Sequence, residues 1–472
     1  MWFGPPVGIV APITQEGGKM GMGGSATKLT WRGWLTTFAV GIAALTAGAG
    51  PVGAAEAPIR VVINQSPWLD GFARIVQAYE KDTGNKVALD VNPYAGSLEK
   101  QRNAVRSASS DYDILIINGI LYAEMYHGGF LTPLTDVDPN FKLDPQVYTF
   151  DDTLWFDAAT KTVNRATGKL MTVPVNPNIT MLFYRKDLYA QNKLKAPETW
   201  EDLLANAKAL NKPPGIWGIT QRAARATIAV SWDYWPYLLS FGGSLFRDEK
   251  HGDFTVTLNS PEARKALDMY IRLAKEAGPK NTASLDQSDL IQYLSTGRSA
   301  HAVLPVAVQA QMEDPNKSIV TGKIGYAVEP HEPGQKSAPA LGHWLAGIPK
   351  NIGDDKKRAA LAFLAWFQKP QTQIRYAELG GTPVSAAAYQ SDFAKKPENA
   401  YMAALAEGLP LAKQMWTIPE GAAFLPILEV GLNRVVAGEM TSAQALNSMS
   451  KDIEAIVAKA GYKTGRLPDL AE

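Results

Sequence analysis

The stretch that decides the fold runs from residue 59 to residue 117 and alternates β-branched runs with helical spacing. It begins with IRVVI at 59–63, a compact apolar run that predicts a buried strand. In DGFARIVQAYEK at 70–81 the large apolar residues recur along one helix face, and Gly84 follows where that helix should end. A second strand, a polar helix and a third strand follow at 86–91, 98–108 and 112–117. This order predicts a parallel α/β sheet with helices on its faces.

Helix-start signals continue the α/β pattern further along the chain. Thr199 can cap a helix that runs to Leu210, with Asp202 placed to reach back to the cap. In Ser260-Pro261-Glu262 a capping hydroxyl precedes a proline at the first helical position, and Gly278 later ends the apolar spacing. Two further amphipathic helices are predicted at 357–368 and 442–460.

Composition and charge narrow the functional classes. The 472 residues carry a net charge of +1, with 47 basic and 46 acidic residues interleaved. This balance provides no basic field for nucleic acid. The chain has no cysteine, which removes disulfides, thiolate nucleophiles, iron–sulfur clusters and the cysteine on which a lipid anchor is built.

The N-terminus has the organisation of a secretory signal. Basic residues precede an apolar run at 34–49, and small residues follow up to Ala57. The run is shorter than the roughly 20 residues that a transmembrane helix needs. We therefore assign residues 1–55 to a signal peptide and N-terminal extension, with cleavage after Ala55 or Ala57, and expect export. An uncleaved membrane anchor is the alternative.

Motifs of the common enzyme classes are absent from the sequence. The chain has no G-x-S-x-G elbow, no phosphate-binding loop and no glycine fingerprint after the first strand. None of the five histidines has a close metal-ligand spacing. We therefore expect neither an enzyme nor a cofactor nor a metal site. The five histidines are His127, His251, His301, His331 and His343.

Aromatic residues are abundant, with 12 Trp and 17 Tyr, and several follow predicted strands. Ligands of open α/β sheets bind beyond the carboxyl ends of the strands. Flat apolar rings beside planar polar groups suit the C–H face and the hydroxyl edge of a sugar. This predicts a carbohydrate site, the alternative being that each Trp packs in a core. The candidates are Trp68, Tyr94, Asn118, Tyr122, Trp232, Trp235 and Trp344.

A series of motifs in order carries a resemblance to a known family. From about residue 59 to 462 the chain resembles the extracellular solute-binding proteins of ATP-binding-cassette importers, in particular the sugar-binding branch that includes the maltose-binding protein. Each motif alone is weak, but the series is specific for the family, though not for the substrate. The motifs are Val173–Asn176, Met181–Leu188, Ala196–Leu203, Trp217–Ile219, Ser240–Gly243, Leu258–Ala263, Leu341–Lys350 and Gly380–Pro383.

The resemblance implies a two-lobed periplasmic-binding-protein fold, type II-like, with a hinge between the lobes. Each lobe should be a mainly parallel sheet flanked by helices. Lobe 1 would comprise residues 56–175 with a return at 331–368. Lobe 2 would comprise residues 180–328 with a return at 370–472.

The resemblance also implies site residues and partners. The first crossing between the lobes would bring Asn176 and Asn178 to the cleft. Trp232 matches an aromatic that commonly stacks on sugar, and Trp344 lies in Gly-His-Trp, whose usual form is Gly-Gly-Trp. The expected protein is a periplasmic monomer without a cofactor or nucleic acid, which delivers a sugar or polyol to the transmembrane subunits of an importer.

Departures from the family pattern leave other ligands open. Ala307 stands where the family often has an aromatic residue, and the Trp that maltose-binding relatives carry near Phe424-Leu425-Pro426 is absent, which argues against maltose. A phosphorylated polyol would call for cleft arginines or a free helix start, and a polyamine for an acidic cleft. A peptide ligand, or an exported polysaccharide hydrolase with two carboxylates distant in sequence, are further alternatives. The candidate arginines are Arg222, Arg225 and Arg375, and the candidate acid is Asp233.

Overall fold

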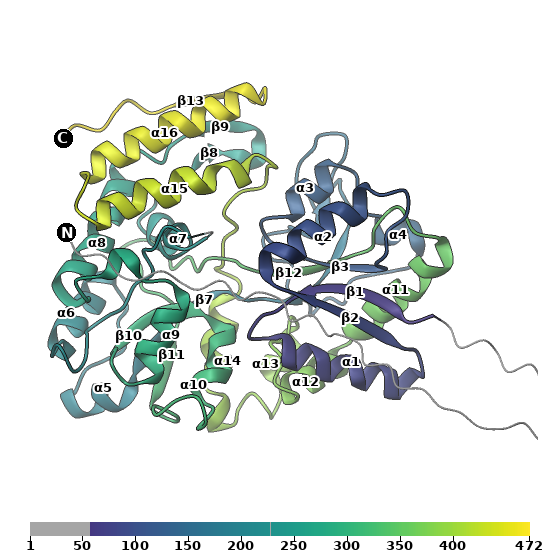
Figure 1. Cartoon of the computed structure of the whole chain (residues 1–472), viewed down its shortest axis with the longest axis horizontal. Helices are drawn as coiled ribbons and strands as arrows, with labels where there is room; N and C mark the ends of the chain where they lie inside the picture. Colours follow the sequence, from purple (N-terminus) through teal and green to yellow (C-terminus); the bar gives the residue numbers. More distant parts are fainter. Residues whose placement is uncertain (1–56, 227) are drawn as a thin grey trace, which may run out of the picture. The chain divides into compact units, whose positions relative to one another are not determined.

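The computed structural model describes residues 57–226 and 228–472, which belong to one compact unit, Glu56–Glu472 (Figure 1). Residues 1–55, which are assigned to the predicted signal peptide, fall outside the described residues. Within the described ranges, no helix combines the length and the apolar character that a membrane span requires.

The first sheet has five strands in the order β2-β1-β3-β12-β6. The predicted strand–helix alternation is confirmed, because β1, β2 and β3 pair in parallel, with Val61 between Leu89 and Ile114. The return strand β12 is antiparallel to both β3 and β6. The strands are β1 (Ile59–Asn64), β2 (Val87–Asn92), β3 (Ile114–Asn118), β6 (Thr172–Asn176) and β12 (Trp344–Gly347).

Helix α1 (Leu69–Thr83) shows how the sequence determines the buried face and the end of a helix that flanks this sheet. Its buried face includes Phe72, Ile75 and Tyr79, the positions that the apolar spacing predicts. Gly84, at a φ of 80°, ends the helix in the left-handed conformation and donates its N–H to the Glu80 carbonyl. The sheet is further flanked by α2 (Tyr94–Arg106) and α11 (Asp354–Phe367), and α12 (Pro370–Glu378) packs on α1.

The second sheet has three strands in the order β10-β7-β11, and both pairings are antiparallel. The two-lobed α/β class holds, but the expectation of a mainly parallel sheet is wrong for this lobe. A strand that arrives from the other lobe starts at the cleft, where the resident strands end, so β7 runs against its neighbours, as β12 does in the first sheet. These strands are β7 (Thr180–Arg185), β10 (His301–Pro305) and β11 (Ile324–Ala327).

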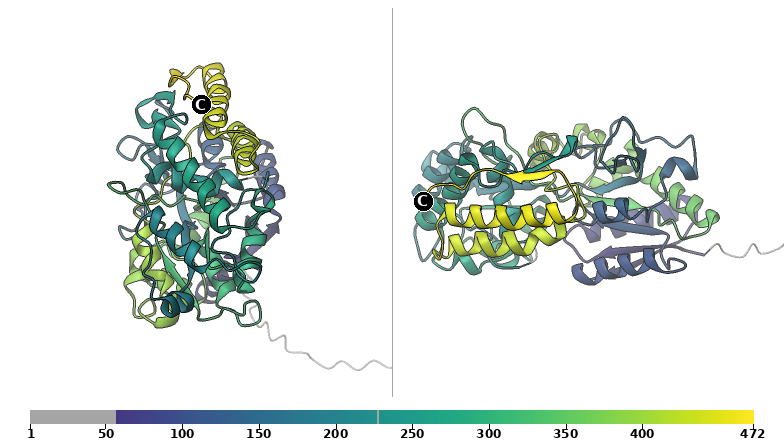
Figure 2. Two further views of the ribbon diagram at one scale, coloured as in Figure 1. Left: turned by 90° about the vertical axis from the view of Figure 1, so that its left-hand side faces the viewer. Right: turned by 90° about the horizontal axis from the view of Figure 1, so that it is seen from above.

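Capped helices surround the second sheet. The predicted capping box of α6 (Trp200–Leu210) forms between Thr199 and Asp202, and Ser260 caps α8 (Pro261–Ala277). Helix α7 (Val230–Ser240) contacts α8 and α15 (Gly421–Val436). Figure 2 shows α15 beside α16 (Ser442–Lys459), both in yellow.

Shorter elements complete the described chain. They are α3 (Tyr122–His127), α4 (Leu134–Val137), β4 (Trp155–Phe156), β5 (Lys169–Leu170), α5 (Lys186–Asn192), β8 (Phe246–Asp248), η1 (Glu249–His251), β9 (Asp253–Val256), η2 (Thr282–Ser284), α9 (Gln287–Ser295), η3 (Val306–Val308), α10 (Gln309–Met312), α13 (Ala386–Gln390), η4 (Pro397–Asn399), α14 (Tyr401–Gly408) and β13 (Thr464–Arg466).

The chain passes between the two sheets more than once. The first crossing joins β6 to β7, and the second crossing, residues 328–343, joins β11 to β12. Helix α12 packs on α1, and Arg375 Nη1 lies 2.8 Å from Asp82 Oδ2. The predicted lobe boundaries stay a proposal, and these contacts favour a return to lobe 2 after α12 rather than at residue 370.

Candidate functional site

A cavity of about 290 Å³ lies between the two sheets, and both contribute to its lining. The first sheet contributes the ends of β1 and β3 and the start of β12. The second sheet contributes the end of β10, and the same lobe adds the start of α7 and the loop before it. The cavity therefore occupies the position at strand ends where α/β sheets bind ligands.

Three aromatic residues form one wall of the cavity. The Trp68 and Trp344 rings are 5.8 Å apart, and the Tyr94 ring meets Trp344 edge-on at 6.2 Å. Asn118 fixes Tyr94 by donating to its hydroxyl, while its own Oδ1 accepts the Ile120 and Leu121 N–H groups at 3.1 Å. Both polar ends of Asn118 are therefore used to hold the wall in place.

The opposite wall is the indole of Trp232. An added Cβ at Gly342 would lie 2.4 Å from Trp232 Cη2, so the ring needs a glycine in the second crossing. Asn178, in the first crossing, has a φ of 35°, a left-handed conformation that asparagine tolerates. The two crossings thus meet the ligand cavity directly, beside Trp232.

A buried ion pair stands at the base of this wall. Arg222 lines the cavity, and its Nε donates to Asp233 Oδ1 at 2.9 Å. The Arg222 backbone N–H donates to Asp233 Oδ2 at the same distance of 2.9 Å. Burial raises the pKa of the Asp233 carboxyl, and the Arg222 guanidinium opposes that rise. The pair brings close to zero net charge to the cavity.

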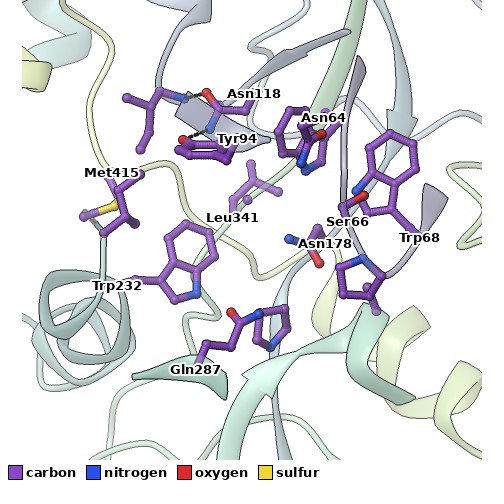
Figure 3. A pocket seen from close by; sticks show the side chains of 18 of the residues that line it. Asn64, Ser66, Trp68, Tyr94, Asn118, Asn178, Trp232, Gln287, Leu341 and Met415 are labelled. Atoms are coloured by element: carbon purple, nitrogen blue, oxygen red, sulfur yellow. Dashed lines mark hydrogen bonds between the residues drawn. The ribbon is translucent and has the colours of Figure 1, made fainter. Parts of the chain in front are cut away.

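Several buried polar atoms around the cavity have no hydrogen-bond partner among the described residues. Such groups are normally paired in folded proteins, so unpaired ones that line a cavity are suited to a ligand. The set mixes acceptors, donors and a hydroxyl (Figure 3). The acceptors are Asn64 Oδ1, Asn178 Oδ1 and Gln414 Oε1, the donors are Trp68 Nε1, Trp232 Nε1 and Arg222 Nη2, and the hydroxyl is Ser66 Oγ.

The charge of the lining is low. Among the described residues that line the cavity, Arg222 is the only ionised side chain, and Asp233 balances it. In the part of the chain that the structure describes, no group of three His, Cys, Asp or Glu residues could hold a metal ion.

Most of the predicted contacts come together in this cavity, and three do not. Those that line it are Trp68, Tyr94, Asn118, Asn178, Trp232 and Trp344. Tyr122 is fully buried and donates to the Trp416 carbonyl at 3.4 Å, because α3 turns its first residue into the core. Asn176 is also fully buried, and Trp235 lines a neighbouring pocket instead.

Sequence reasoning missed other lining residues. Asn64 and Ser66 follow the first strand, so the rule that selected Trp68 could have found them. Gln287 and Gln414 come from distant parts of the chain and carry no sequence signal. Arg222 was considered only for a phosphate, a role that its pairing with Asp233 does not favour.

Two sheet-based lobes that meet at an aromatic, amide-lined cavity define the class of two-lobed binding proteins. The family comparison makes the assignment specific, since the profile of the bacterial extracellular solute-binding proteins matches residues 65–374. The chain belongs to this family, which confirms the resemblance drawn from the motifs.

The names of the curated relatives refer to binding proteins for different solutes. The mannitol-binding protein of Pseudomonas aeruginosa is 26% identical over 392 residues, which cover 76% of this chain and 83% of that protein. A probable amino-acid ABC transporter periplasmic-binding protein of Sinorhizobium fredii is 24% identical over 302 residues, covering 63% of this chain and 67% of that protein.

Solved structures share the fold. A maltose-bound protein of T. maritima has a TM-score of 0.72 at 21% identity, covering 84% of this chain and 99% of its own. A solute-binding protein of Agrobacterium vitis with bound D-mannitol has a TM-score of 0.68 at 21% identity, covering 86% and 99%. At these identities the likeness concerns the fold, and it confirms the predicted two-lobed class.

Proposed function

We propose that the exported protein binds one uncharged, polyhydroxylated solute, a sugar or a polyol, in the cavity between its lobes. It then delivers that solute, as a periplasmic monomer, to the transmembrane subunits of an ABC importer. The observation that carries the proposal is the mixed set of unpaired donors and acceptors in a nearly neutral, aromatic cavity.

Hydroxyl groups match this set because each one both donates and accepts. An anion would engage donors alone, and an ammonium group would engage acceptors alone. The C–H faces of a carbohydrate chain or ring can lie against Trp232 and the Trp68–Trp344 wall. The lining therefore favours a neutral ligand over the phosphorylated polyol and the polyamine.

Cavity size favours a small ligand. A volume of about 290 Å³ lies just below the roughly 300–1,000 Å³ that small-molecule sites occupy. One sugar unit or one linear polyol fits this range better than an oligosaccharide. The departures at Ala307 and Phe424, which argue against maltose, point the same way.

The names of the relatives give support of unequal weight. The Pseudomonas relative is named for mannitol, and one structural neighbour holds D-mannitol. The Sinorhizobium relative is named as a probable amino-acid transporter protein. An amino acid carries two opposite charges that need partners, and Arg222 and Asp233 already neutralise each other. We therefore favour the polyol or sugar.

The proposed mechanism is closure of the lobes on the ligand. A solute that touches both walls stabilises the closed form relative to the open one, and only such differential contact shifts the balance. The cavity provides this contact, with Trp344 on one side and Trp232 on the other.

A thermal-shift screen tests the proposal. Purified protein is heated with neutral sugars and polyols, and in parallel with a phosphorylated polyol, amino acids and a polyamine. A neutral ligand at a hundredfold excess over its dissociation constant should add about 2.7 kcal/mol of apparent stability. A larger shift from any charged solute would reject the proposal. Recovery of altered sugar from the same mixtures would instead support the hydrolase.

A further inference from the structure

We propose that Arg222 is the specificity-determining contact of this cavity, with its Nη2 donating to one ligand hydroxyl. The protein would then select among neutral polyols and sugars by the presence of a hydroxyl at one position. This inference rests on the proposed function and deepens it. It starts from a buried arginine whose hydrogen-bonding capacity is only partly used.

The guanidinium is held on several sides. Nε donates to Asp233 Oδ1 at 2.9 Å, and Nη1 donates to Gln287 Oε1 at 3.2 Å. Tyr270 donates its hydroxyl to the Arg222 carbonyl at 2.7 Å, which anchors the backbone. The side chain is only 8% exposed. The position of the free edge is therefore fixed before any ligand arrives.

Nη2 remains without a hydrogen bond. It lies 2.9 Å from Asp233 Oδ1 as part of the ion pair, yet it makes no hydrogen bond within the described residues. A guanidinium carries five N–H groups, so the bonds at Nε and Nη1 and the contact of Nη2 with Asp233 leave one Nη2 N–H available. Arg222 lines the cavity, and the inference assigns this N–H to a ligand oxygen.

The ion pair decides which kind of oxygen is preferred. Asp233 is 2% exposed and takes two bonds from Arg222, so the charge of the guanidinium is compensated inside the protein. A phosphate or carboxylate would add net negative charge to a buried, neutral site. A hydroxyl oxygen accepts the N–H without adding charge.

The helices that carry Asp233 and Gln287 fix the position of the ion pair relative to Trp232. Asp233 follows Trp232 in the first turn of α7, so one helix start positions both. Gln287 is the first residue of α9, whose start is fixed by the capping box of Asp286 and Asp289. Arg222 acts on the ligand, and Asp233 and Gln287 are positioning residues.

A fixed, buried donor discriminates strongly between close analogues. A site built to bond a hydroxyl rejects the analogue that lacks it, because the buried polar group is then left unpaired. Apolar contacts with Trp232 discriminate much less, since a ring face accepts any C–H surface. Deoxy analogues therefore separate the arginine from the ring.

The experiment measures binding by calorimetry. The tightest ligand among D-mannitol, ribitol and D-glucose is compared with its monodeoxy derivatives, each lacking one hydroxyl. In the wild-type protein one derivative should bind at least a hundredfold more weakly than the parent. In Arg222→Gln the ratio of the parent's affinity to that of this derivative should fall below about fivefold. The ratios for the derivatives that lack another hydroxyl should stay unchanged.

Two further variants keep the test interpretable. The double variant Arg222→Gln with Asp233→Asn removes both buried charges, so it covers the case in which the single variant does not fold. Arg225→Gln is the matched control, because Arg225 bonds to Asn433 and lies outside the cavity lining. It should keep the wild-type ratios at every position.

Each outcome decides a different statement. If the folded Arg222 variants retain the position-specific loss, the role of Arg222 is rejected and the proposed function stands. If the wild-type protein binds none of the three parent ligands while it binds a charged solute, the proposed function itself fails. The inference is supported if the Arg222 variants lose discrimination at one hydroxyl position while Arg225→Gln keeps it.

Discussion

At the scale of single residues, several side chains use one polar end to bond to the protein. This bond fixes the position of the other polar end, which has no partner among the described residues. Gln414 Nε2 donates to the Gly119 carbonyl at 2.6 Å, which fixes the amide and leaves Oε1 unpaired. Asn118 differs, since both of its polar ends are engaged in holding the Tyr94 wall and its loop. The residues that bind are thus separable from those that support them.

Trp232 and Trp344 should each contribute strongly to affinity. Truncation of either to alanine removes a buried ring face from one wall, and we expect a loss of about 1–3 kcal/mol of binding free energy. Titration calorimetry with the best sugar or polyol measures it. Trp155→Ala is the matched control, because Trp155 packs under Arg165 away from the cavity. Unchanged affinity in both cavity variants would contradict the site.

Gly342 should be intolerant of even a methyl group. In Gly342→Ala the new Cβ would lie 2.4 Å from the Trp232 ring and 3.0 Å from the Asn178 carbonyl oxygen. We expect the ring to shift and affinity to fall at least tenfold in a folded protein, measured by calorimetry and circular dichroism. Gly96→Ala serves as control, because an added Cβ there meets nothing within 4 Å. Equal affinities in the two variants would be inconsistent with this packing.

At the scale of elements, helix α7 owes its starting point to another helix. Ala229 stands at the N-cap and offers no side-chain cap, so Glu429 of α15 takes that role. Glu429 accepts the N–H of Ala229 at 2.9 Å and of Val230 at 3.1 Å. A carboxylate is favourable at a helix N-terminus, and here it positions the turn that carries Trp232.

Replacing this distant cap should weaken both the helix start and the site. Glu429→Ala removes the acceptor for buried N–H groups, and we expect a loss of about 1–3 kcal/mol of unfolding free energy with reduced ligand affinity. Urea unfolding and calorimetry measure the two effects. The exposed Glu398→Ala should change neither. Full retention of affinity by a stably folded Glu429→Ala would show that α7 is positioned by other contacts.

The second crossing contains a buried acid, Glu329, which makes stability depend on pH. It is 1% exposed, and its burial, reinforced by Asp233 nearby, raises the pKa to about 8 from 4.5, while Thr180 opposes the shift. The unfolded state releases this proton at lower pH than the folded state does. The stabilisation is therefore complete below pH 4.5 and is lost as pH rises through 8.

Glu329→Gln should remove that dependence. We expect the variant to be more stable than the wild type at pH 8.5, by about 5 kcal/mol at most, with the difference disappearing near pH 4.5. Urea unfolding at several pH values measures it, with Glu398→Gln as an exposed control. A stability difference between Glu329→Gln and the wild type that grows as pH falls would contradict the raised pKa of Glu329.

Elements were more predictable than the site, for a physical reason. The starts of α6 and α8 follow from caps within three residues, and α1 follows from its own apolar face. Gln414 reaches the cavity through a bond to Gly119, 295 residues away, which no local pattern encodes. Tyr122 shows the opposite error, because a strand-end position was correct while the following helix turned the ring inward.

At the scale of the whole molecule, the proposed closure relies on contacts that a ligand adds between the lobes. An ion pair joins Lys250, next to the β8–β9 hairpin, to Asp151 in the first lobe at 2.8 Å. The Lys250 side chain is 53% exposed, and such surface pairs contribute little and weaken with salt. A solute between Trp344 and Trp232 adds buried contacts that this pair lacks. A bound solute would therefore add to the protein contacts that join the lobes.

The central claim, that the cavity takes a neutral polyhydroxylated solute, is tested most directly by titration calorimetry with a matched pair. The purified protein is titrated with D-mannitol and with D-mannitol 1-phosphate, and the same comparison is made with glucose and its phosphate. The account predicts one-to-one binding of an uncharged member, with its phosphate at least a hundredfold weaker. Tighter binding of either phosphate than of its uncharged parent would contradict it.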